Sequence, residues 1–149
     1  MTVQTKAYGP VEIDQRQVID VSGGLFGFEH LRKYALIDAH KQPFYWLQSL
    51  EQTEVAFVLL NPLLFRPDYT LDAGEDDLAA LDYETQEDLL VFCIVTIPED
   101  DRFMTANLRG PLVINRKSQI GRQVISTNQK WGVRHNIREE LSRMRSDAC

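Results

Sequence analysis

The sequence predicts an all-β fold with short helices, arranged as a small β-barrel-like single domain over residues 1–149. Two observations favour this class. About ten short segments are rich in aromatic and β-branched residues, with turn-forming residues between them. No helical segment alternates with them in the βαβ order that a parallel sheet requires. Because so many strands would leave many edges exposed, we expect the sheet to close into a barrel, or nearly so, or to fold as a sandwich.

The first half of the chain predicts six strands. Gly9-Pro10 is a turn pair and predicts a hairpin at the N-terminus. A glycine-rich break follows the third strand, and residues 28–33 then have the pattern of one helical turn. The six predicted strands are residues 3–8, 11–14, 17–21, 33–39, 44–50 and 55–60.

The second half mixes strands with helices. Acidic residues at 75–77 precede Leu78 and Leu81, whose spacing suits one helical face, so we expect a short helix between 72 and 88. Residues 89–97 are a continuous apolar run, which predicts a central strand buried on both faces. The remaining strands, with turns predicted at 110–111 and 117–119, are residues 68–71, 103–108, 112–115 and 120–126.

A helix is predicted at the C-terminal end, from about residue 136. Asn136 followed by Glu139 matches a capping box. Ile137, Leu141 and Met144 share one helical face, which leaves a basic outer surface.

Charge divides the chain into two parts. The net charge is −6, yet residues 67–101 hold twelve acidic side chains and no Lys, Arg or His. Residues 102–149 hold ten Lys or Arg against three acids. This division indicates either two surfaces with different electrostatic partners or a fold in which the two parts neutralise each other. A nucleic-acid surface is disfavoured, because the chain is acidic and its basic residues are scattered.

Several features favour the cytoplasm and no membrane association. The N-terminus has no apolar targeting segment, and the longest apolar run is far shorter than the ~20 residues that a membrane helix needs. Cys93 lies within that run and Cys149 is the last residue, so we expect no disulfide framework.

The sequence offers little catalytic chemistry. The three histidines, His30, His40 and His135, lie in different segments without ligand spacing, so we expect no metal site. There is no Gly-x-Ser-x-Gly motif, and Cys93 is expected to be an inert core thiol. The loop at 23–27 matches neither a phosphate-binding nor a dinucleotide-binding fingerprint, so we expect no cofactor and no enzymatic activity.

Motifs along most of the chain resemble those of the flagellar assembly factor FliW family. The most specific stretch is Val95-Thr96-Ile97-Pro98-Glu99-Asp100, followed by the segments at 104–108 and 111–115. The likeness runs in order from about residue 5 to 135. The other matching segments are residues 5–13, 27–29, 44–51, 56–58, 61–62, 67–69, 122–125 and 134–135.

The resemblance implies a function in regulation. FliW proteins resemble small barrel adaptors that bind the translational repressor CsrA away from its RNA-contacting residues and so antagonise it allosterically. They also bind flagellin, which competes for them. The resemblance therefore implies a cytoplasmic partner switch that controls flagellin synthesis, with no direct contact to nucleic acid.

Candidate partner-binding residues fall into two groups. Four acids are expected to meet a basic partner through the positive-charge-free segment, and these are Asp72, Glu75, Asp76 and Asp77. Polar or amphipathic residues within the family motifs are the second group, comprising Gln48, Glu51, Asp68, Tyr69 and Asn107. At Asp68 and Asn107 a turn closed by the side chain itself is the competing interpretation.

An enzyme or small-molecule carrier built on a barrel is the alternative function, either binding a ligand or hydrolysing one. Such a protein needs a deep apolar pocket with converging polar groups. The aromatic strands would instead fill a small barrel. The motif residues expected in the core are Leu47, Phe57, Val95, Ile97, Leu112 and Ile114.

Overall fold

The computed structural model of the protein describes residues 1–147, so Cys149 lies outside the described residues. The described part of the chain has ten strands: β1 (Thr2–Thr5), β2 (Gly9–Glu12), β3 (Val18–Val21), β4 (Lys33–Asp38), β5 (Tyr45–Ser49), β6 (Ala56–Leu60), β7 (Leu89–Thr96), β8 (Thr105–Asn115), β9 (Ile120–Gln123) and β10 (His135–Asn136). Its helices are α1 (Glu75–Ala79) and α2 (Ile137–Asp147), with short 3-10 turns η1 (Gln15–Gln17), η2 (Pro62–Leu64), η3 (Gln86–Asp88) and η4 (Asp101–Phe103).

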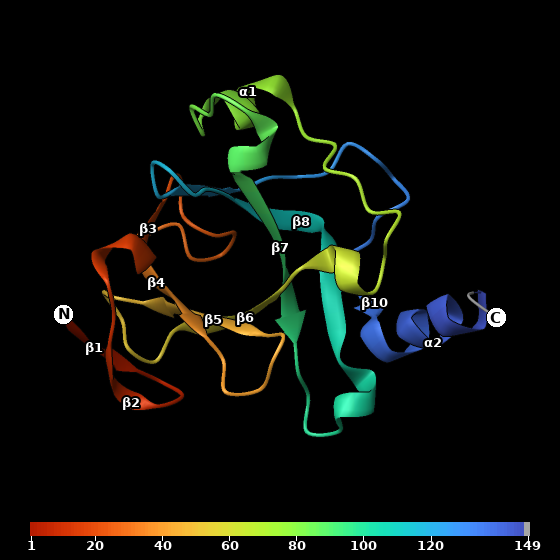
Figure 1. The fold of residues 1–149 in the computed structure, drawn as a ribbon, viewed down its shortest axis with the longest axis horizontal. Helices are drawn as coiled ribbons and strands as arrows, with labels where there is room; N and C mark the ends of the chain where they lie inside the picture. Colours follow the sequence, from red (N-terminus) through yellow and green to blue (C-terminus); the bar gives the residue numbers. More distant parts are fainter. Residues whose placement is uncertain (148–149) are drawn as a thin grey trace.

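The main sheet closes into a barrel, which confirms the predicted all-β class (Figure 1). From β3 to β8 each strand pairs antiparallel with the next. Closure depends on β9, which pairs antiparallel with β8 and parallel with β3. The seven strands from β3 to β9 therefore form a ring, and β10 adds to the outside of β8. A ring leaves these strands without free edges.

Alternate residues of the strands fill the barrel. Tyr34, Leu47, Leu59 and Leu112 are fully buried and belong to one apolar cluster. Aromatic pairs add to this cluster, with Phe57 of β6 packed against Phe28 and Tyr45 of β5 against Phe92. The interior is thus a packed core.

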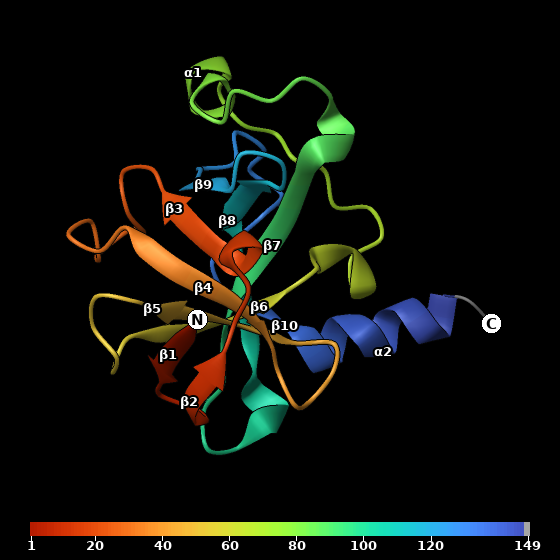
Figure 2. The same cartoon turned by 60° about the vertical axis from the view of Figure 1, so that its left-hand side comes forward.

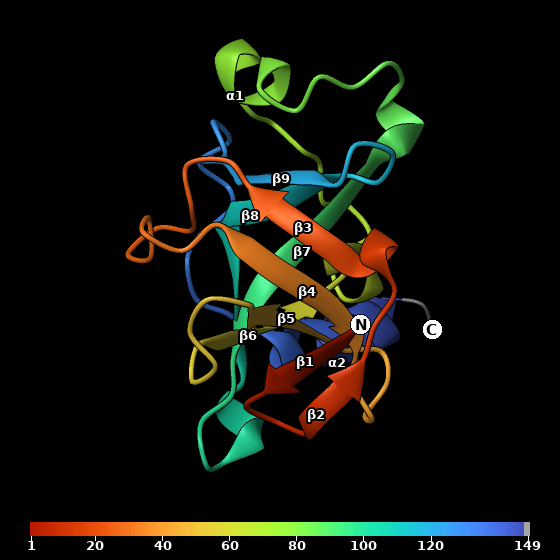
Figure 3. The same ribbon diagram turned by 90° about the vertical axis from the view of Figure 1, so that its left-hand side faces the viewer.

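Two further layers cover the outside of the barrel. The β1–β2 hairpin lies across β4 and β5 and buries Val3 against Ala35 and Ile37 (Figure 3). On another side, α2 packs Ile137 into a cluster with Trp131 and the outward-facing residues of β7 and β8. α1 stands on a long loop at one end of the barrel, away from α2 (Figure 2). The described residues include no helix long and apolar enough to cross a membrane.

Most predicted elements are present, and the expected C-terminal helix is α2, which begins at Ile137. The helical turn expected at 28–33 is wrong. Two hydrogen-bonded turns occupy this loop, from the Phe28 amide to the Leu25 carbonyl and from Leu31 to Phe28. Here a Cβ on Gly24 would lie 2.5 Å from the Glu29 Cα, so the close backbone approach requires glycine.

Three other expectations are corrected. Residues 68–71 form no strand. Arg66 donates two hydrogen bonds to the Asp68 carboxylate, and the Tyr69 amide closes a turn on the Arg66 carbonyl. Gly110-Pro111 is not a turn but a bend within the continuous strand β8, where the pairing with β7 shifts register. Ile97, expected in the core, is 48% exposed because β7 ends one residue before it. Leu47, Val95, Leu112 and Ile114 are buried as predicted, and Phe57 is partly buried against the core.

Candidate functional site

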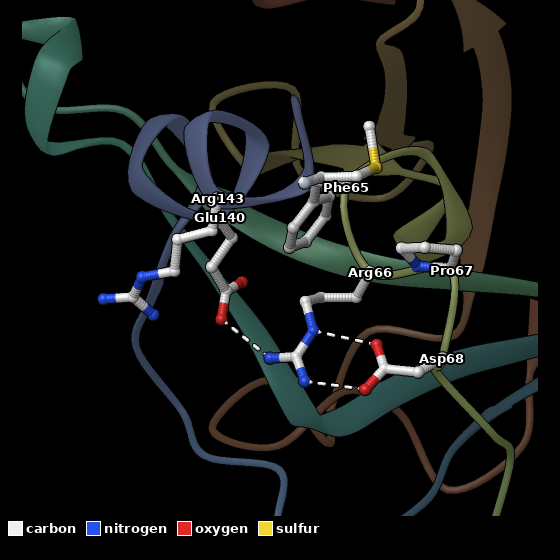
Figure 4. Close-up of a pocket in the computed structure, with 7 residues that line it drawn as sticks. Phe65, Arg66, Pro67, Asp68, Glu140 and Arg143 are labelled. Carbon is white, nitrogen blue, oxygen red and sulfur yellow. Dashed lines mark hydrogen bonds and ion pairs between the residues drawn. The ribbon is translucent and has the colours of Figure 1, made fainter. Parts of the chain in front are cut away.

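An ion-pair network joins α2 to the loop that follows η2 (Figure 4). Glu140, on α2, is 8% exposed, and its Oε1 accepts a hydrogen bond from Arg66 Nη1 at 2.9 Å. The same oxygen lies 2.7 Å from His135 Nδ1. The other ring nitrogen, Nε2, accepts from the Gly132 amide at 2.8 Å, so Nδ1 is the nitrogen that donates to Glu140. The two donors compensate part of the cost of burying this carboxylate, while its other oxygen, Oε2, is buried without a hydrogen-bond partner among the described residues.

Asp68 extends this network towards the surface. Arg66 donates from Nε and Nη2 to its two carboxylate oxygens, each at 2.9 Å, and Lys130 Nζ lies 2.5 Å from Oδ2. The fork from Arg66, with Lys130 second, holds the Asp68 pKa well below its ordinary value. The exposed carboxylate of Asp68 is paired with two cations of the chain, Arg66 and Lys130.

Trp131 is the apolar support of this network. The Arg66 guanidinium lies 4.7 Å from the indole centroid and the Lys130 ammonium 5.0 Å, both at cation–π distance. Tyr69 packs against the same indole with ring centroids 4.8 Å apart and donates its hydroxyl to the Leu108 carbonyl at 2.8 Å. Burial raises the Tyr69 pKa. With 7% exposure, Tyr69 belongs to the packing and presents almost no surface.

In the acidic loop around α1, residues 72–77, the two outer acids are paired within the chain and the two inner acids face solvent. Asp72 Oδ2 accepts from Thr70 Oγ1 at 2.6 Å and from Asn128 Nδ2 at 3.2 Å. Asp77 pairs with Arg122 at 3.1 Å. Glu75 and Asp76, in the first turn of α1, are exposed to solvent. The outward negative charge of α1 therefore comes mainly from these two.

Gln48 and Glu51 lie elsewhere, near the end of β5 and in the turn that follows it. Gln48 is 1% exposed and holds the N-terminal hairpin, accepting from the Lys6 amide at 2.8 Å and donating to the Thr53 carbonyl at 2.8 Å. Glu51 is exposed, and its Oε1 accepts from the amides of Lys33 at 2.7 Å and Arg32 at 3.0 Å. These two amides, Lys33 first, lower the Glu51 pKa.

Asn107 shapes the bend of β8. Its Oδ1 accepts from the Arg109 amide at 3.0 Å and from the Gly110 amide at 2.9 Å. The competing interpretation, a turn closed by the side chain, therefore describes this residue well. Asn107 also lines an open hollow of about 530 Å³ at one end of the barrel, beside the exposed rings of Phe26 and Phe103.

The chemistry of Cys93 agrees with a packing role. Its thiol is buried and donates to the Leu60 carbonyl at 3.2 Å, and burial raises its pKa to about 12. Within residues 1–147, no three His, Cys, Asp or Glu side chains are grouped to hold a metal ion.

The structure brings some predicted residues together and separates others. Asp68, Tyr69 and Asp72 all contact the 127–131 segment or its neighbour Leu108, next to Asn107. Gln48 and Glu51 contact the β1–β2 hairpin and β4 instead. Sequence reasoning missed the partners at the centre of the first group, which are Arg66, Lys130, Trp131, His135 and Glu140. Of these five residues, only His135 lies in a segment that the sequence alone identifies as a family motif, residues 134–135.

Comparisons with known proteins all indicate one family, over nearly the full length of the chain. The sequence model described as "FliW protein" matches residues 2–137. The flagellar assembly factor FliW of Treponema denticola is 46% identical over 142 residues, covering 95% of this chain and 97% of that protein. The FliW of Treponema pallidum is 40% identical over 146 residues, covering 98% and 97%. A crystal structure of the flagellar assembly factor FliW superposes with a TM-score of 0.84 at 30% identity, covering 92% of this chain and 96% of that one.

Proposed function

The chain belongs to the FliW protein family, and from this premise we propose that it is a flagellar assembly factor that acts by binding other proteins. The observation that carries the proposal is the match itself. It extends over nearly the full length of this chain and of its relatives, in both sequence and fold.

The proposed partners are the translational repressor CsrA and flagellin. The chain binds CsrA away from its RNA-contacting surface and antagonises it allosterically. Flagellin competes for the chain, so an excess of flagellin in the cytoplasm releases CsrA and lowers flagellin translation. No catalytic step is part of this function. The filled barrel, with Tyr34 and Leu59 fully buried, also leaves little interior room for the alternative of an enclosed ligand.

The proposed contact for the basic partner is the acidic loop, with Glu75 and Asp76 foremost. Both are exposed on α1, whereas Asp72 and Asp77 divide their charge between solvent and partners within the chain. Exposed charges at the rim of an interface act mainly on the rate of association.

Of the motif residues, Glu51, Asp68 and Asn107 retain accessible surface for a partner. Gln48 and Tyr69 are buried, and in this proposal they support two separate areas, that of Glu51 and that of Asp68 and Asn107, through their hydrogen bonds to Lys6 and Leu108.

Competition between the two partners tests the proposal. The full chain is immobilised, loaded with purified CsrA and then titrated with purified flagellin monomer. We expect both proteins to bind separately and flagellin to displace CsrA. Failure of both to bind would refute the proposed partners, and formation of a stable ternary complex would refute the switch.

The acidic surface has its own test, the double variant Glu75→Gln with Asp76→Asn. We expect slower association with CsrA and a weaker dependence of the rate on salt, with little change in dissociation. The matched control removes the same charge from exposed positions elsewhere, as Glu29→Gln with Glu54→Gln. Equal effects of the two variants on the association rate would mean that only net charge matters, and would remove α1 from the interface.

A further inference from the structure

A groove runs beside α2, between this helix and the loop that joins β4 to β5. It consists of two adjoining hollows of about 340 and 490 Å³. Four side chains line both hollows and make them one feature, and these are Lys41, Phe44, Met104 and Arg138.

The floor of the groove is apolar and firmly held. Phe44 and Met104 are partly buried and pack against the cluster beneath α2. The Ile137 amide donates to the Met104 carbonyl at 3.1 Å, which fixes the start of α2 along the floor. At the far end, Leu64 and Leu141 line the second hollow, and Leu64 is 44% exposed.

Aromatic side chains form the wall of the first hollow. Tyr8 stacks on His40 with ring centroids 3.8 Å apart, and its hydroxyl accepts from Trp46 Nε1 at 3.0 Å and from the His40 amide at 2.8 Å. Ile97, the motif residue that the fold leaves exposed, lines this hollow too. Side chains locked in this way lose little freedom when a ligand binds, so the groove is preorganised.

The rim of the groove is cationic in a chain whose net charge is −6. Three charged side chains line the second hollow, Lys41, Arg138 and Arg145, and all are basic. In the first hollow Asp101 accompanies Arg138, and the two are paired at 2.9 Å. The chain as a whole is negative, but this rim is positive, so an acidic segment of another protein would be attracted to the groove.

We propose that this groove binds an acidic amphipathic segment of a protein partner. Apolar side chains of the segment enter the two hollows, and its carboxylates meet Lys41, Arg138 and Arg145 at the rim. A flat anionic membrane fits less well, because the apolar groups lie within a concave groove beneath the charges. The inference rests on the groove alone, and it concerns a surface separate from α1 and of opposite charge.

A displayed library of random peptides of about 16 residues, long enough for about four helical turns, is the probe. It is selected on the full chain with counter-selection on the double variant Lys41→Glu with Arg138→Glu. We expect the enriched peptides to be acidic, with apolar residues at helical spacing. Enrichment of neutral or basic peptides, or no enrichment, overturns the proposal.

Synthetic copies of the enriched peptides are then titrated by fluorescence anisotropy. Leu64→Ala should weaken binding by roughly tenfold, the effect expected for losing one buried apolar anchor. Leu63→Ala is the control, because Leu63 is exposed next to it but lines a different hollow. Lys41→Glu with Arg138→Glu should abolish binding, whereas Lys6→Glu with Arg109→Glu, exposed cations outside the groove, should leave affinity unchanged.

Charge reversal and vesicles complete the test. A peptide with its acids changed to Lys should bind the Lys41→Glu, Arg138→Glu variant and not the native chain. Sedimentation with phosphatidylglycerol vesicles should show no binding that depends on Lys41 and Arg138. Vesicle binding lost in that variant, or peptide binding unaffected by the groove substitutions, would refute the proposed occupant. Melting temperatures of all variants exclude unfolding as the cause.

Discussion

Replacing Arg66 with alanine should destabilise the fold far more than the loss of a solvent-exposed ion pair would. Arg66 donates at 2.9 Å to Glu140, whose side chain is 8% exposed, and to both oxygens of Asp68. Its guanidinium also covers the Trp131 ring at 4.7 Å. The substitution leaves Glu140 buried with His135 as its remaining side-chain partner.

The expected magnitude follows from these contacts. Removing one partner of a buried ion pair costs about 3–5 kcal/mol, because a buried charge is left uncompensated. The exposed fork to Asp68 adds little, about 0–1 kcal/mol, and the cation–π contact adds about 0.5–1 kcal/mol. Since the Arg66 side chain is 21% exposed, water can replace part of it at Glu140. We therefore expect a loss of about 3 kcal/mol in the free energy of unfolding.

Urea denaturation of the variant measures this loss. Arg102→Ala is the matched control, since Arg102 forms the same fork with a carboxylate two residues away, Asp100, on the open surface. It should leave the free energy of unfolding nearly unchanged, because a fully exposed ion pair contributes little to stability. The double variant Arg66→Met with Glu140→Leu, which removes the buried carboxylate as well, should recover part of the loss. Equal costs for Arg66→Ala and Arg102→Ala would refute the reasoning that burial of Glu140 sets the effect.

Three other predictions concern burial and pH. Leu47→Ala should cost about 2–5 kcal/mol of stability, while Ile97→Ala, at an exposed position, should stay within about 0.5 kcal/mol; similar midpoints in urea for both would contradict the described core. Tyr69→Phe should lose about 1 kcal/mol with its hydrogen bond to Leu108, measured in the same way, and an unchanged midpoint would show that this bond has no net value. Because the folded-state pKa of Asp68 is lowered, its pairing stabilises the protein at pH values above the unfolded pKa of about 3.9 and is lost as pH falls below it. Asp68→Asn should therefore flatten the fall in stability on acidification, and an unaltered pH profile would argue against the pairing.

The strands and helices were largely predictable because their causes are local. Strand residues alternate or run apolar between glycine and proline breaks, and the capping residue Asn136 marks the start of α2. One error occurred where a side-chain hydrogen bond overrode the turn signal of the residue types. Proline and glycine at 110–111 indicate a turn, but Asn107 caps the adjacent amides and β8 continues as a bent strand.

The candidate site was less predictable, because burial of a polar side chain depends on distant partners. The sequence around Gln48 does not distinguish it from an exposed strand residue. It is nevertheless buried, and its side chain accepts a hydrogen bond from the Lys6 amide, 42 residues away. Arg66 meets Glu140 across 74 residues. Whether such a residue faces a partner or the core is set by chain contacts that no local pattern records.

The sequence by itself determined the all-β class, the approximate strands, the acidic and basic parts and the likeness to the FliW family. Only the tertiary structure decided how these parts are arranged. The parallel pairing of β9 with β3 closes the barrel, a contact between residues about a hundred positions apart. Figure 1 shows α1 and α2 on separate parts of the molecule. The fold also pairs several acids of residues 67–101 with cations of residues 102–149, including Asp68 with Lys130, Asp77 with Arg122 and Asp101 with Arg138, so the acidic and basic parts partly neutralise each other. Local propensity fixes a strand, but register and long-range packing fix its neighbours, and the surfaces that partners meet follow from those neighbours.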